Sequence, residues 1–311
     1  MNRLPSAHRS PCCSQRGFTL IEAIMVIVIT GIVAGMVAVF IKTSIDSYLA
    51  SVRRADLTDA AELSVRRMTR DVRLALPNSL RVRDSAGTIG GCSNAPGVTC
   101  FIELIPTSNG GRYRDVGDGS TGGNVLSYTS TAATSFDVLG VMPALATNAL
   151  NGNGDYVVVY NLGPGYAPAN AYGFSSCGVA PGCNIAQVQS VAGNTVTLAS
   201  NPFAAQTPPL PSPGSRFHLV PYATRAVTYA CPTGTAGPFM RYWGYGFQAS
   251  QPTSFGAGSS SLLFSNVTCA VDYTTAVLQR NGLLFVKLNI TDAASGETIT
   301  VFGQVHVDNS P

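Results

Sequence analysis

In the 311-residue chain, residues 16–41 read RGFTLIEAIMVIVITGIVAGMVAVFI. Between Phe18 and Ile41 this stretch holds one charged residue, Glu22. The uncharged run 23–41 would span ~28 Å as a helix, at about 1.5 Å per residue, which matches the ~30 Å hydrocarbon core of a membrane. We therefore expect a membrane-spanning helix near the amino end.

A cleaved secretory signal peptide is one alternative, because residues 1–17 carry basic side chains and no acidic one. The apolar run, however, exceeds the roughly 7–15 residues of a signal-peptide core, and no small-x-small site with a polar flank follows it. A carboxylate in a membrane segment is costly unless it is paired. Cleavage between Gly17 and Phe18 would create an α-amino group four residues before Glu22, able to pair with it within one chain or between neighbouring subunits.

The order Arg16-Gly17-Phe18-Thr19-Leu20-Ile21-Glu22 before a long apolar run resembles the class III signal of type IV pilins and type II secretion pseudopilins. The resemblance implies that a prepilin peptidase cuts after Gly17 and methylates the new amino-terminal Phe18. It also implies that Glu22 registers each subunit against its neighbour during assembly. Gly31 matches a glycine common in that family's membrane helix, whereas Val39 stands where major pilins often have a proline.

Beyond the membrane segment, the pattern predicts that the same helix continues. Apolar residues recur every three or four positions from Ile45 to Leu76, and charged residues cover the other faces. Pro77-Asn78 is expected to stop the helix. A helix over 18–76 would be ~88 Å long at about 1.5 Å per residue, a length that fits a first half in lipid and a second half packed on a domain.

From Leu80 onward, short alternating apolar runs are separated by Gly, Pro, Asn and Ser. This predicts an antiparallel, β-rich globular domain with long loops, packed on the amphipathic half of the helix, so the fold class is α+β. The expected organisation is a cleaved leader (1–17), a transmembrane and assembly half-helix (18–41), an amphipathic half-helix (42–76) and a periplasmic β-rich domain (77–311). The expected strands are 100–105, 125–129, 135–139, 156–160, 195–199, 217–220, 226–231, 239–243, 283–289 and 298–307, with a turn at 294–296.

Residues 119–215 contain only two charged residues, Asp137 and Asp155. We expect this region to be a large, ordered insertion of loops and short strands. Its uncharged surface suits contact with another subunit or a receptor, and long extracytoplasmic loops without a binding role are the equal alternative.

Eight cysteines are present, and two of them, Cys12 and Cys13, lie in the leader. An even set of six in an exported domain indicates disulfides, whose connectivity six cysteines leave open. We select the pairs whose members close short Gly/Pro-rich loops or join two expected strand regions. A zinc site is disfavoured because there is no Cys-x-x-Cys pair with a nearby His. The selected pairs are Cys92–Cys100, Cys177–Cys183 and Cys231–Cys269.

The search for catalytic motifs indicates no enzyme and no cofactor. The histidines are His8, His218 and His306, and no metalloprotease, nucleophile-elbow or phosphate-loop motif occurs. Two Asn/Asp/Gly stretches offer alternating oxygen ligands for Ca²⁺, but ordinary turns are the favoured interpretation. The residues concerned are Asp115, Asp118 and Asn124 in one stretch and Asn151, Asn153 and Asp155 in the other.

The composition disfavours two further classes of protein. Charged residues make up 11% of the chain and hydrophobic residues 45%, which argues against charge-driven disorder. The net charge of +3 equals the contribution of the three arginines in residues 1–17, so the remaining chain is neutral. No nucleic-acid partner is expected, because acidic residues intermix with the arginines of the helix and no aromatic residues are interleaved for base stacking.

Further stretches narrow the resemblance to the minor pilins of MSHA-type pilus systems. They include ADLTDAA at 55–61, RDVR at 70–73, ALPNS at 75–79, GGRYR at 110–114 and VHVDN at 305–309. The resemblance implies a low-abundance subunit that helps to prime filament assembly and lies at or near the tip. It would be held in the inner membrane, with its domain in the periplasm, until it enters a surface pilus.

The implied partners are the major pilin, other minor pilins, the prepilin peptidase, the inner-membrane assembly platform with its ATPase, and membrane lipid. Three alternatives stay open. The chain could be a tip adhesin whose contact surface is residues 119–215, a minor pseudopilin of a type II secretion system, or a single-pass membrane enzyme that carries a pilin leader.

Overall fold

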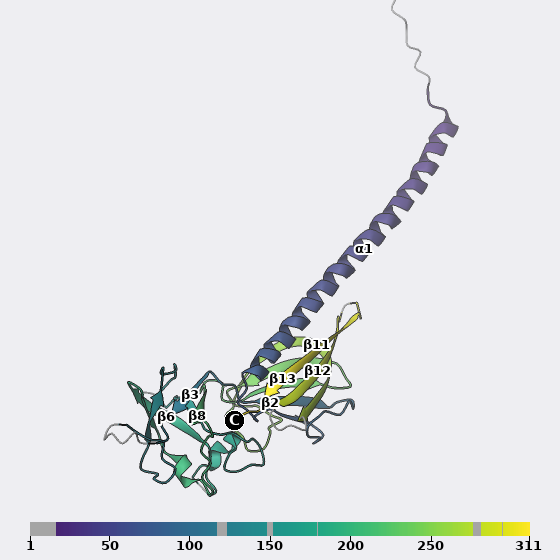
Figure 1. The fold of residues 1–311 in the computed structure, drawn as a ribbon. Coiled ribbons are helices and arrows are strands. Elements are labelled where there is room, and N and C mark those ends of the chain that lie inside the picture. The colour runs from purple at the N-terminus through teal and green to yellow at the C-terminus, as the bar shows by residue number, and fades with distance from the viewer. Residues whose placement is uncertain (1–16, 117–122, 148–151, 179, 276–280, 294) are drawn as a thin grey trace, which may run out of the picture. The chain divides into compact units, whose positions relative to one another are not determined.

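The computed structural model describes residues 17–116, 123–147, 152–178, 180–275, 281–293 and 295–311. The chain divides into two compact units, Met1–Ala55 and Asp56–Pro311. A long N-terminal helix leads into antiparallel β-structure, so the expected α+β class is confirmed (Figure 1). The leader residues 1–16, with Cys12, Cys13 and His8, lie outside the described residues.

The helix α1 runs from Leu20 to Arg73. It is the one helix in the described chain long and apolar enough to cross a membrane. Within the first unit its apolar side chains are exposed. Within the second unit one stripe of the helix is buried, and its members follow the three- and four-residue spacing expected of an amphipathic face: Ala61, Ser64, Met68 and Val72.

The helix ends at Arg73, three residues before the expected end at Leu76. The cause is a competing backbone interaction with the segment after strand β2 (Thr99–Leu104). The carbonyl of Leu74 accepts a hydrogen bond from Thr107 N–H (2.8 Å), and Leu76 N–H donates to the carbonyl of Ile105 (2.7 Å). Residues 74–76 therefore pair with 105–107 in place of a further helical turn.

A seven-stranded antiparallel sheet forms one part of the second unit. Its buried face, together with the stripe of α1, forms a continuous apolar core that includes Met68, Ile102, Phe239 and Leu288. In spatial order the strands are β1 (Arg81–Asp84), β2 (Thr99–Leu104), β9 (Val227–Pro232), β10 (Gly237–Trp243), β11 (Ser259–Thr275), β12 (Asn281–Thr291) and β13 (Thr298–Asp308).

A closed six-stranded barrel forms the other part. Four of its strands come from residues 119–215, the region with only two charged residues. Apolar side chains such as Tyr113, Phe136 and Phe217 fill its interior. Two short 3-10 helices, Ala171–Ser176 and Pro202–Ala205, lie in its loops. In spatial order the strands are β3 (Asn109–Tyr113), β4 (Ser135–Leu139), β7 (Thr195–Leu198), β6 (Ile185–Ala192), β5 (Tyr156–Val158) and β8 (Arg216–Val220).

The barrel corrects the boundaries and the character of the expected loop-rich insertion. It begins at Asn109 and ends at Val220, and its first and last strands pair with each other, with Asn109 opposite Leu219. The chain therefore leaves the sheet and returns to it at neighbouring points. Closure of six short strands removes their free edges, which the sequence pattern did not reveal.

One expected strand is wrong, and four strands were not expected. Residues 125–129 form no ladder, although Leu126 N–H donates to the carbonyl of Arg114. In β3, Gly110 and Gly111 resemble a turn, but a side chain at either position would come within 2.8 Å of Phe217. Strands β1, β6 and β11 were missed as well.

Candidate functional site

The predicted processing junction lies just outside α1. Gly17, Phe18 and Thr19 are non-helical, and Phe18 is 79% exposed. The hydroxyl oxygen of Thr19 accepts a hydrogen bond from Glu22 N–H (3.3 Å), and its carbonyl accepts one from Ala23 N–H (3.2 Å). Thr19 is thus the N-cap of the helix, and Thr-x-x-Glu supplies the residue types of a capping box.

This cap places the predicted junction outside the helix. Because the helix starts at Leu20, the Gly17–Phe18 bond belongs to an exposed, non-helical segment. Glu22 lies in the first turn, where the partial positive charge of the helix end favours a carboxylate. The capping role of Thr19 was missed in the sequence analysis, although the Thr-x-x-Glu pattern could have revealed it.

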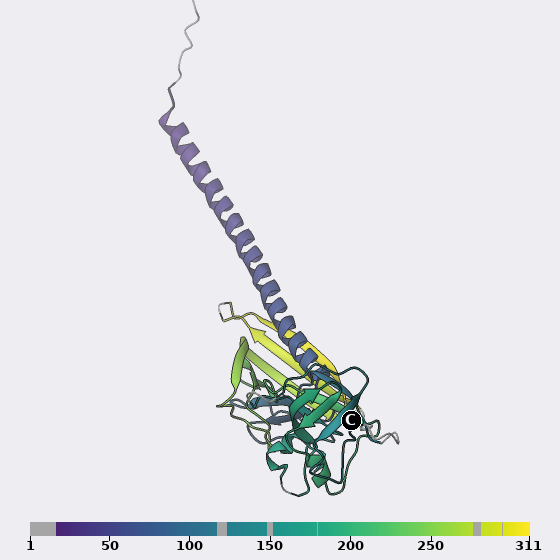
Figure 2. The ribbon, with the colours of Figure 1, turned by 90° about the vertical axis from the view of Figure 1, so that its left-hand side faces the viewer.

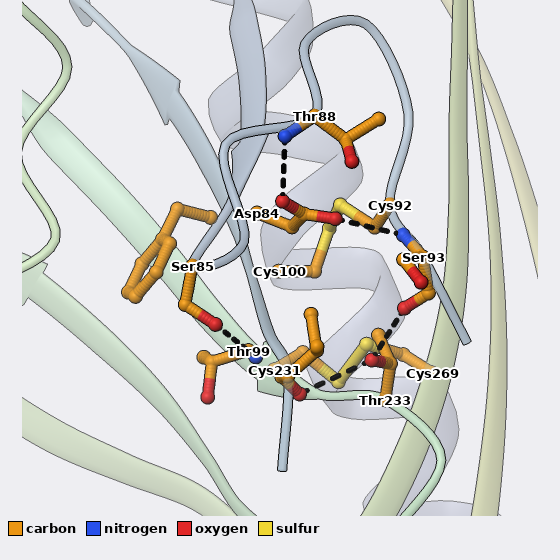
Figure 3. Close-up of a disulfide and its surroundings, with 12 residues drawn as sticks. Asp84, Ser85, Thr88, Cys92, Ser93, Thr99, Cys100, Cys231, Thr233 and Cys269 are labelled. Atoms are coloured by element: carbon orange, nitrogen blue, oxygen red, sulfur yellow. Dashed lines mark hydrogen bonds between the residues drawn. A yellow bond between two sulfur atoms is a disulfide. The ribbon is translucent and has the colours of Figure 1, made fainter. Parts of the chain in front are cut away.

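The six cysteines of the described chain form three disulfides, so the expected disulfide bonds are present. They join the same pairs that were selected from the sequence. Cys100 on β2 and Cys231 on β9 are direct register partners, so two of the disulfides lie side by side in the sheet (Figure 3). Through Cys92 and Cys269 they tie the loop after β1 and strand β11 to this point.

A buried carboxylate organises the loop beside these disulfides. Asp84 accepts hydrogen bonds from the backbone N–H groups of Thr88 (2.7 Å) and Ser93 (2.9 Å), as Figure 3 shows. Burial alone would raise the pKa of Asp84, but the backbone donors of Ser93 and Thr88 outweigh it and hold the pKa below its usual value. Thr233 fastens the same loop by donating its hydroxyl proton to the carbonyl of Ser93 (2.6 Å). The hydrogen bonds of Asp84 and Thr233 therefore hold the loop after β1 in place.

Neither charge of region 119–215 is free to act on a ligand. Asp155 is buried and accepts from the N–H groups of Ala146 (2.8 Å) and Tyr222 (2.9 Å). Asp137 accepts from the hydroxyl of Thr195 (2.7 Å) and lies 3.6 Å from the guanidinium of Arg114. The described part of residues 119–215 therefore offers no exposed charged side chain.

In the described parts of the two calcium-like stretches, side-chain oxygens take part in hydrogen bonds within the chain. Asn124 binds Asp137, and Asp115 accepts a hydrogen bond from the hydroxyl of Ser215. Asp118 and Asn151 lie outside the described residues. Among described side chains, no group of three or more His, Cys, Asp or Glu could hold a metal ion. Of the histidines, His306 is exposed on β13 and His218 is half-buried on β8.

A family model described as the prokaryotic N-terminal methylation motif matches residues 12–38. Comparisons with curated proteins and with solved structures found no match for the chain. The matched motif includes the Gly17–Phe18 junction, Glu22 and the start of α1. It supports a type IV pilin-like or pseudopilin subunit, and the single apolar helix fits a membrane-anchored protein of that kind.

Proposed function

We propose that the chain is a minor pilin of a type IV, MSHA-type pilus, similar to MshO, that helps to prime filament assembly at or near the tip. The observation that carries the proposal is the methylation motif joined to a capped helix, with the Gly17–Phe18 bond exposed just before the cap. The finer MSHA assignment is supported by the sequence stretches quoted above, which extend from the second half of α1 to the end of β13.

In this proposal the prepilin peptidase cleaves after Gly17 and methylates Phe18. The apolar half of α1 remains in the inner membrane, with the β-rich unit in the periplasm, until the assembly platform and its ATPase add the subunit to a filament. There, Glu22 pairs with a neighbouring pilin's terminal amine. The pairing has a physical motive, since a carboxylate buried in a helical bundle is tolerated only with a partner.

Intact-mass analysis of the chain purified from membranes tests the processing steps. We expect a chain that starts at Phe18, carries one added methyl group, and has six fewer hydrogens because of its three disulfides. A chain that retains residues 1–17 in cells with an active prepilin peptidase would contradict the proposal.

Assembly is tested with Glu22→Val and the matched control Glu22→Asp, each followed by counting of surface pili. We expect Glu22→Val to be processed but to lose most pili, because it has no carboxylate to pair with the amine. Glu22→Asp keeps the charge and should retain a larger share of pili. Wild-type piliation by a processed Glu22→Val chain would show that the pairing is dispensable.

A tip adhesin is the second candidate, and it is favoured by the surface of residues 119–215, whose described part has no exposed charged side chain. Val141 and Tyr166 are 93% and 61% exposed on that surface and can be changed without opening the barrel core. If the chain is an adhesin, Val141→Asp with Tyr166→Asp should leave pilus number normal and reduce attachment. Leu262→Asp, at an exposed site of the sheet, is the control. Equal attachment by all variants would remove this candidate.

The secretion-pseudopilin alternative shares the leader and the helix, and differs in the consequence of deletion. Loss of the whole gene should remove pili if the proposal is right. It should block protein secretion and leave pili intact if the chain is a pseudopilin.

A further inference from the structure

The two edges of the seven-stranded sheet differ in how their backbone groups are used. At one edge, β1 is only four residues long. Backbone groups of β1 that point away from β2 form hydrogen bonds with the loop that follows β1. Gly90 N–H donates to the carbonyl of Val82 (2.9 Å), and Asp84 N–H donates to the carbonyl of Thr88 (3.0 Å). At the other edge, β13 is 11 residues long. Among the described residues, no backbone hydrogen bond joins its free edge to another segment.

The register of β12 and β13 identifies the backbone groups that face outward. Asp292 N–H donates to the carbonyl of Glu297 (2.8 Å), so the pair just before Thr291 and Thr298 is hydrogen-bonded. Hydrogen-bonded and non-hydrogen-bonded pairs alternate along an antiparallel ladder. Alternate residues of β13 therefore direct both N–H and C=O away from β12. In the interior of the strand these are Thr300, Phe302, Gln304 and His306.

Strand β13 lacks the features that normally protect an open edge. It contains no Pro and no Lys, its register with β12 has no bulge, and its only charged residue is Asp308 at the end. At about 3.4 Å per residue the edge is ~37 Å long. A row of alternating backbone donors and acceptors of this length complements another extended chain.

An exposed aromatic pair lies on the outer face beside this edge. Phe302 is 61% exposed and Phe285, on β12, is 39% exposed. Their ring centroids are 6.1 Å apart, and the amine of Lys287 lies 5.7 Å from the ring of Phe302. A strand added to β13 would place a side chain directly beside Phe302, where cross-strand pairs with aromatic residues are stabilising.

We propose that the free edge of β13 binds an extended, uncharged strand of another filament subunit, which adds an eighth strand to the seven-stranded sheet. The inference rests on the proposed function, because a neighbouring pilin supplies the strand. A second copy of this chain is the competing occupant. Antiparallel pairing of two β13 strands would follow a two-fold axis and would reverse, in one copy relative to the other, the part of α1 that belongs to the second unit, residues 56–73. Under the proposed function, subunits that enter one filament from one membrane share an orientation, so such a pair does not form in the filament.

The test uses Gln304→Pro, because the N–H of Gln304 faces the free edge and its removal leaves the β12 ladder complete. Gln304→Thr is the matched control, since it changes the side chain and keeps the N–H. Each full-length chain is produced in cells that lack the wild-type copy. Its amount in sheared filaments is compared with its amount in membranes, and intact mass checks that all three disulfides have formed.

We expect the filament share of Gln304→Pro to fall about tenfold or more, the equivalent of one or two lost backbone hydrogen bonds. Gln304→Thr should remain close to wild type. Hydrogen exchange gives a second measurement: the amides of Thr300, Phe302, Gln304 and His306 should exchange fast in the detergent-solubilised chain and slowly in filaments.

Three results would overturn the inference, and they are distinguishable. Normal entry of Gln304→Pro into filaments, with edge amides that stay fast, would show that β13 is not an interface although the function holds. A purified wild-type dimer that Gln304→Pro converts to a monomer would show that the occupant is a second copy. Absence of wild-type chain from filaments would remove the proposed function and this inference with it.

Discussion

Glu103 has no exposed surface, yet it carries a carboxylate in the middle of β2. Two side chains from other parts of the fold donate hydrogen bonds to it. Arg81 on β1 donates to it at 2.6 Å, and the hydroxyl of Tyr245 donates to it at 2.8 Å. Tyr245 also shares a hydrogen bond with Thr228 (2.6 Å), and the guanidinium of Arg81 lies 3.6 Å from the ring centre of Tyr172. A buried charge is tolerated here because every part of the network has a partner.

Removal of Arg81 should therefore be costly. We expect Arg81→Met to lower the free energy of unfolding by about 3–5 kcal/mol, because it leaves Glu103 as an unpaired buried charge. The double variant Arg81→Met/Glu103→Leu should recover much of the loss, whereas Arg73→Met, at an exposed site of α1, should have almost no effect. Urea unfolding of the detergent-solubilised chain measures all three. Equal stabilities of the single and double variants would show that the two charges are not coupled.

Asp84 predicts a pH dependence of stability. Its pKa is lower in the folded chain than the usual value of about 3.9, so the folded state favours the ionised form. The stability that this gives is complete above about pH 4 and is lost as the pH falls through the lowered folded pKa. Asp84→Asn should cost about 1–3 kcal/mol at neutral pH, because an amide cannot accept from both backbone N–H groups as a carboxylate does.

The check on Asp84 is a series of unfolding curves between neutral pH and pH 2, with Asp84→Asn compared at each point. The gap between wild type and variant should shrink as the solution becomes more acidic. A gap of constant size would mean that Asp84 acts without its charge. Asp137, whose pKa is also lowered, chiefly by the hydroxyl of Thr195, remains in both chains and cancels in the comparison.

Among individual residues, the buried networks leave no signal in the local sequence, whereas the helix cap does. Glu103 sits in the apolar run TCFIEL, and its partners Arg81 and Tyr245 lie 22 and 142 positions away. No local spacing relates such residues, because the fold alone brings them together. The cap at Thr19 is the opposite case, since its partner is three positions away and the signal was present in the sequence.

Between elements, a close approach of α1 to the sheet depends on a glycine. A side-chain carbon at Gly303 on β13 would lie 2.8 Å from a methyl group of Val65 on α1. Both residues belong to the second unit, where β13 runs beside the lower turns of α1 (Figure 2). The alternation of β13 continues after Gly303, with Val305 and Val307 buried against the core.

We expect Gly303→Ala to lower stability by about 1–3 kcal/mol, because the added methyl group overpacks this contact. Val65→Ala removes the opposing methyl groups and should restore part of the loss when combined with Gly303→Ala. A double-mutant cycle with thermal or urea unfolding measures the coupling. Additive effects of the two changes would show that they do not share the contact.

Elements with a clear apolar period were predicted, and those defined by neighbours were not. The helix and the paired strands β12 and β13 follow from their own spacing. Strand β11 has a polar, Ser-rich start, and it is held as a strand by β10 on one side and β12 on the other. Closure of the barrel depends on the pairing of β3 with β8, more than a hundred positions away. Such pairing leaves no trace in a local pattern.

Across the second unit, the barrel and the sheet share a core and are not separate modules. Leu76, Ile105 and Tyr245 pack in one buried cluster with Tyr156 and Tyr172 of the barrel region. Asn78, which follows α1, also connects the barrel region to the end of the chain. Its side-chain amide donates to the carbonyls of Asn161 (2.9 Å) and Asn309 (3.1 Å). Excision of the whole barrel would therefore uncover apolar surface, which makes point changes on its exterior the sharper test of adhesion.

The three disulfides close loops of different length, so we expect their contributions to the free energy of unfolding to differ. A crosslink restricts the unfolded chain more when it closes a longer loop. Cys231–Cys269 has a sequence separation of 38, against 8 for Cys92–Cys100 and 6 for Cys177–Cys183. Chain entropy then predicts losses of about 4, 2.5 and 2 kcal/mol on replacement of each pair by alanine.

Unfolding of the three double-alanine variants under oxidising conditions measures the order of these losses. Because Cys100 and Cys231 are neighbours in the sheet, their two disulfides also allow a test of additivity. If the two adjacent disulfides brace the same part of the unfolded chain, removal of both should cost less than the sum of the separate losses. Strict additivity would show that they act independently. A larger loss for Cys177–Cys183 than for Cys231–Cys269 would mean that native packing in the barrel loop, and not loop length, sets the contribution of each bridge.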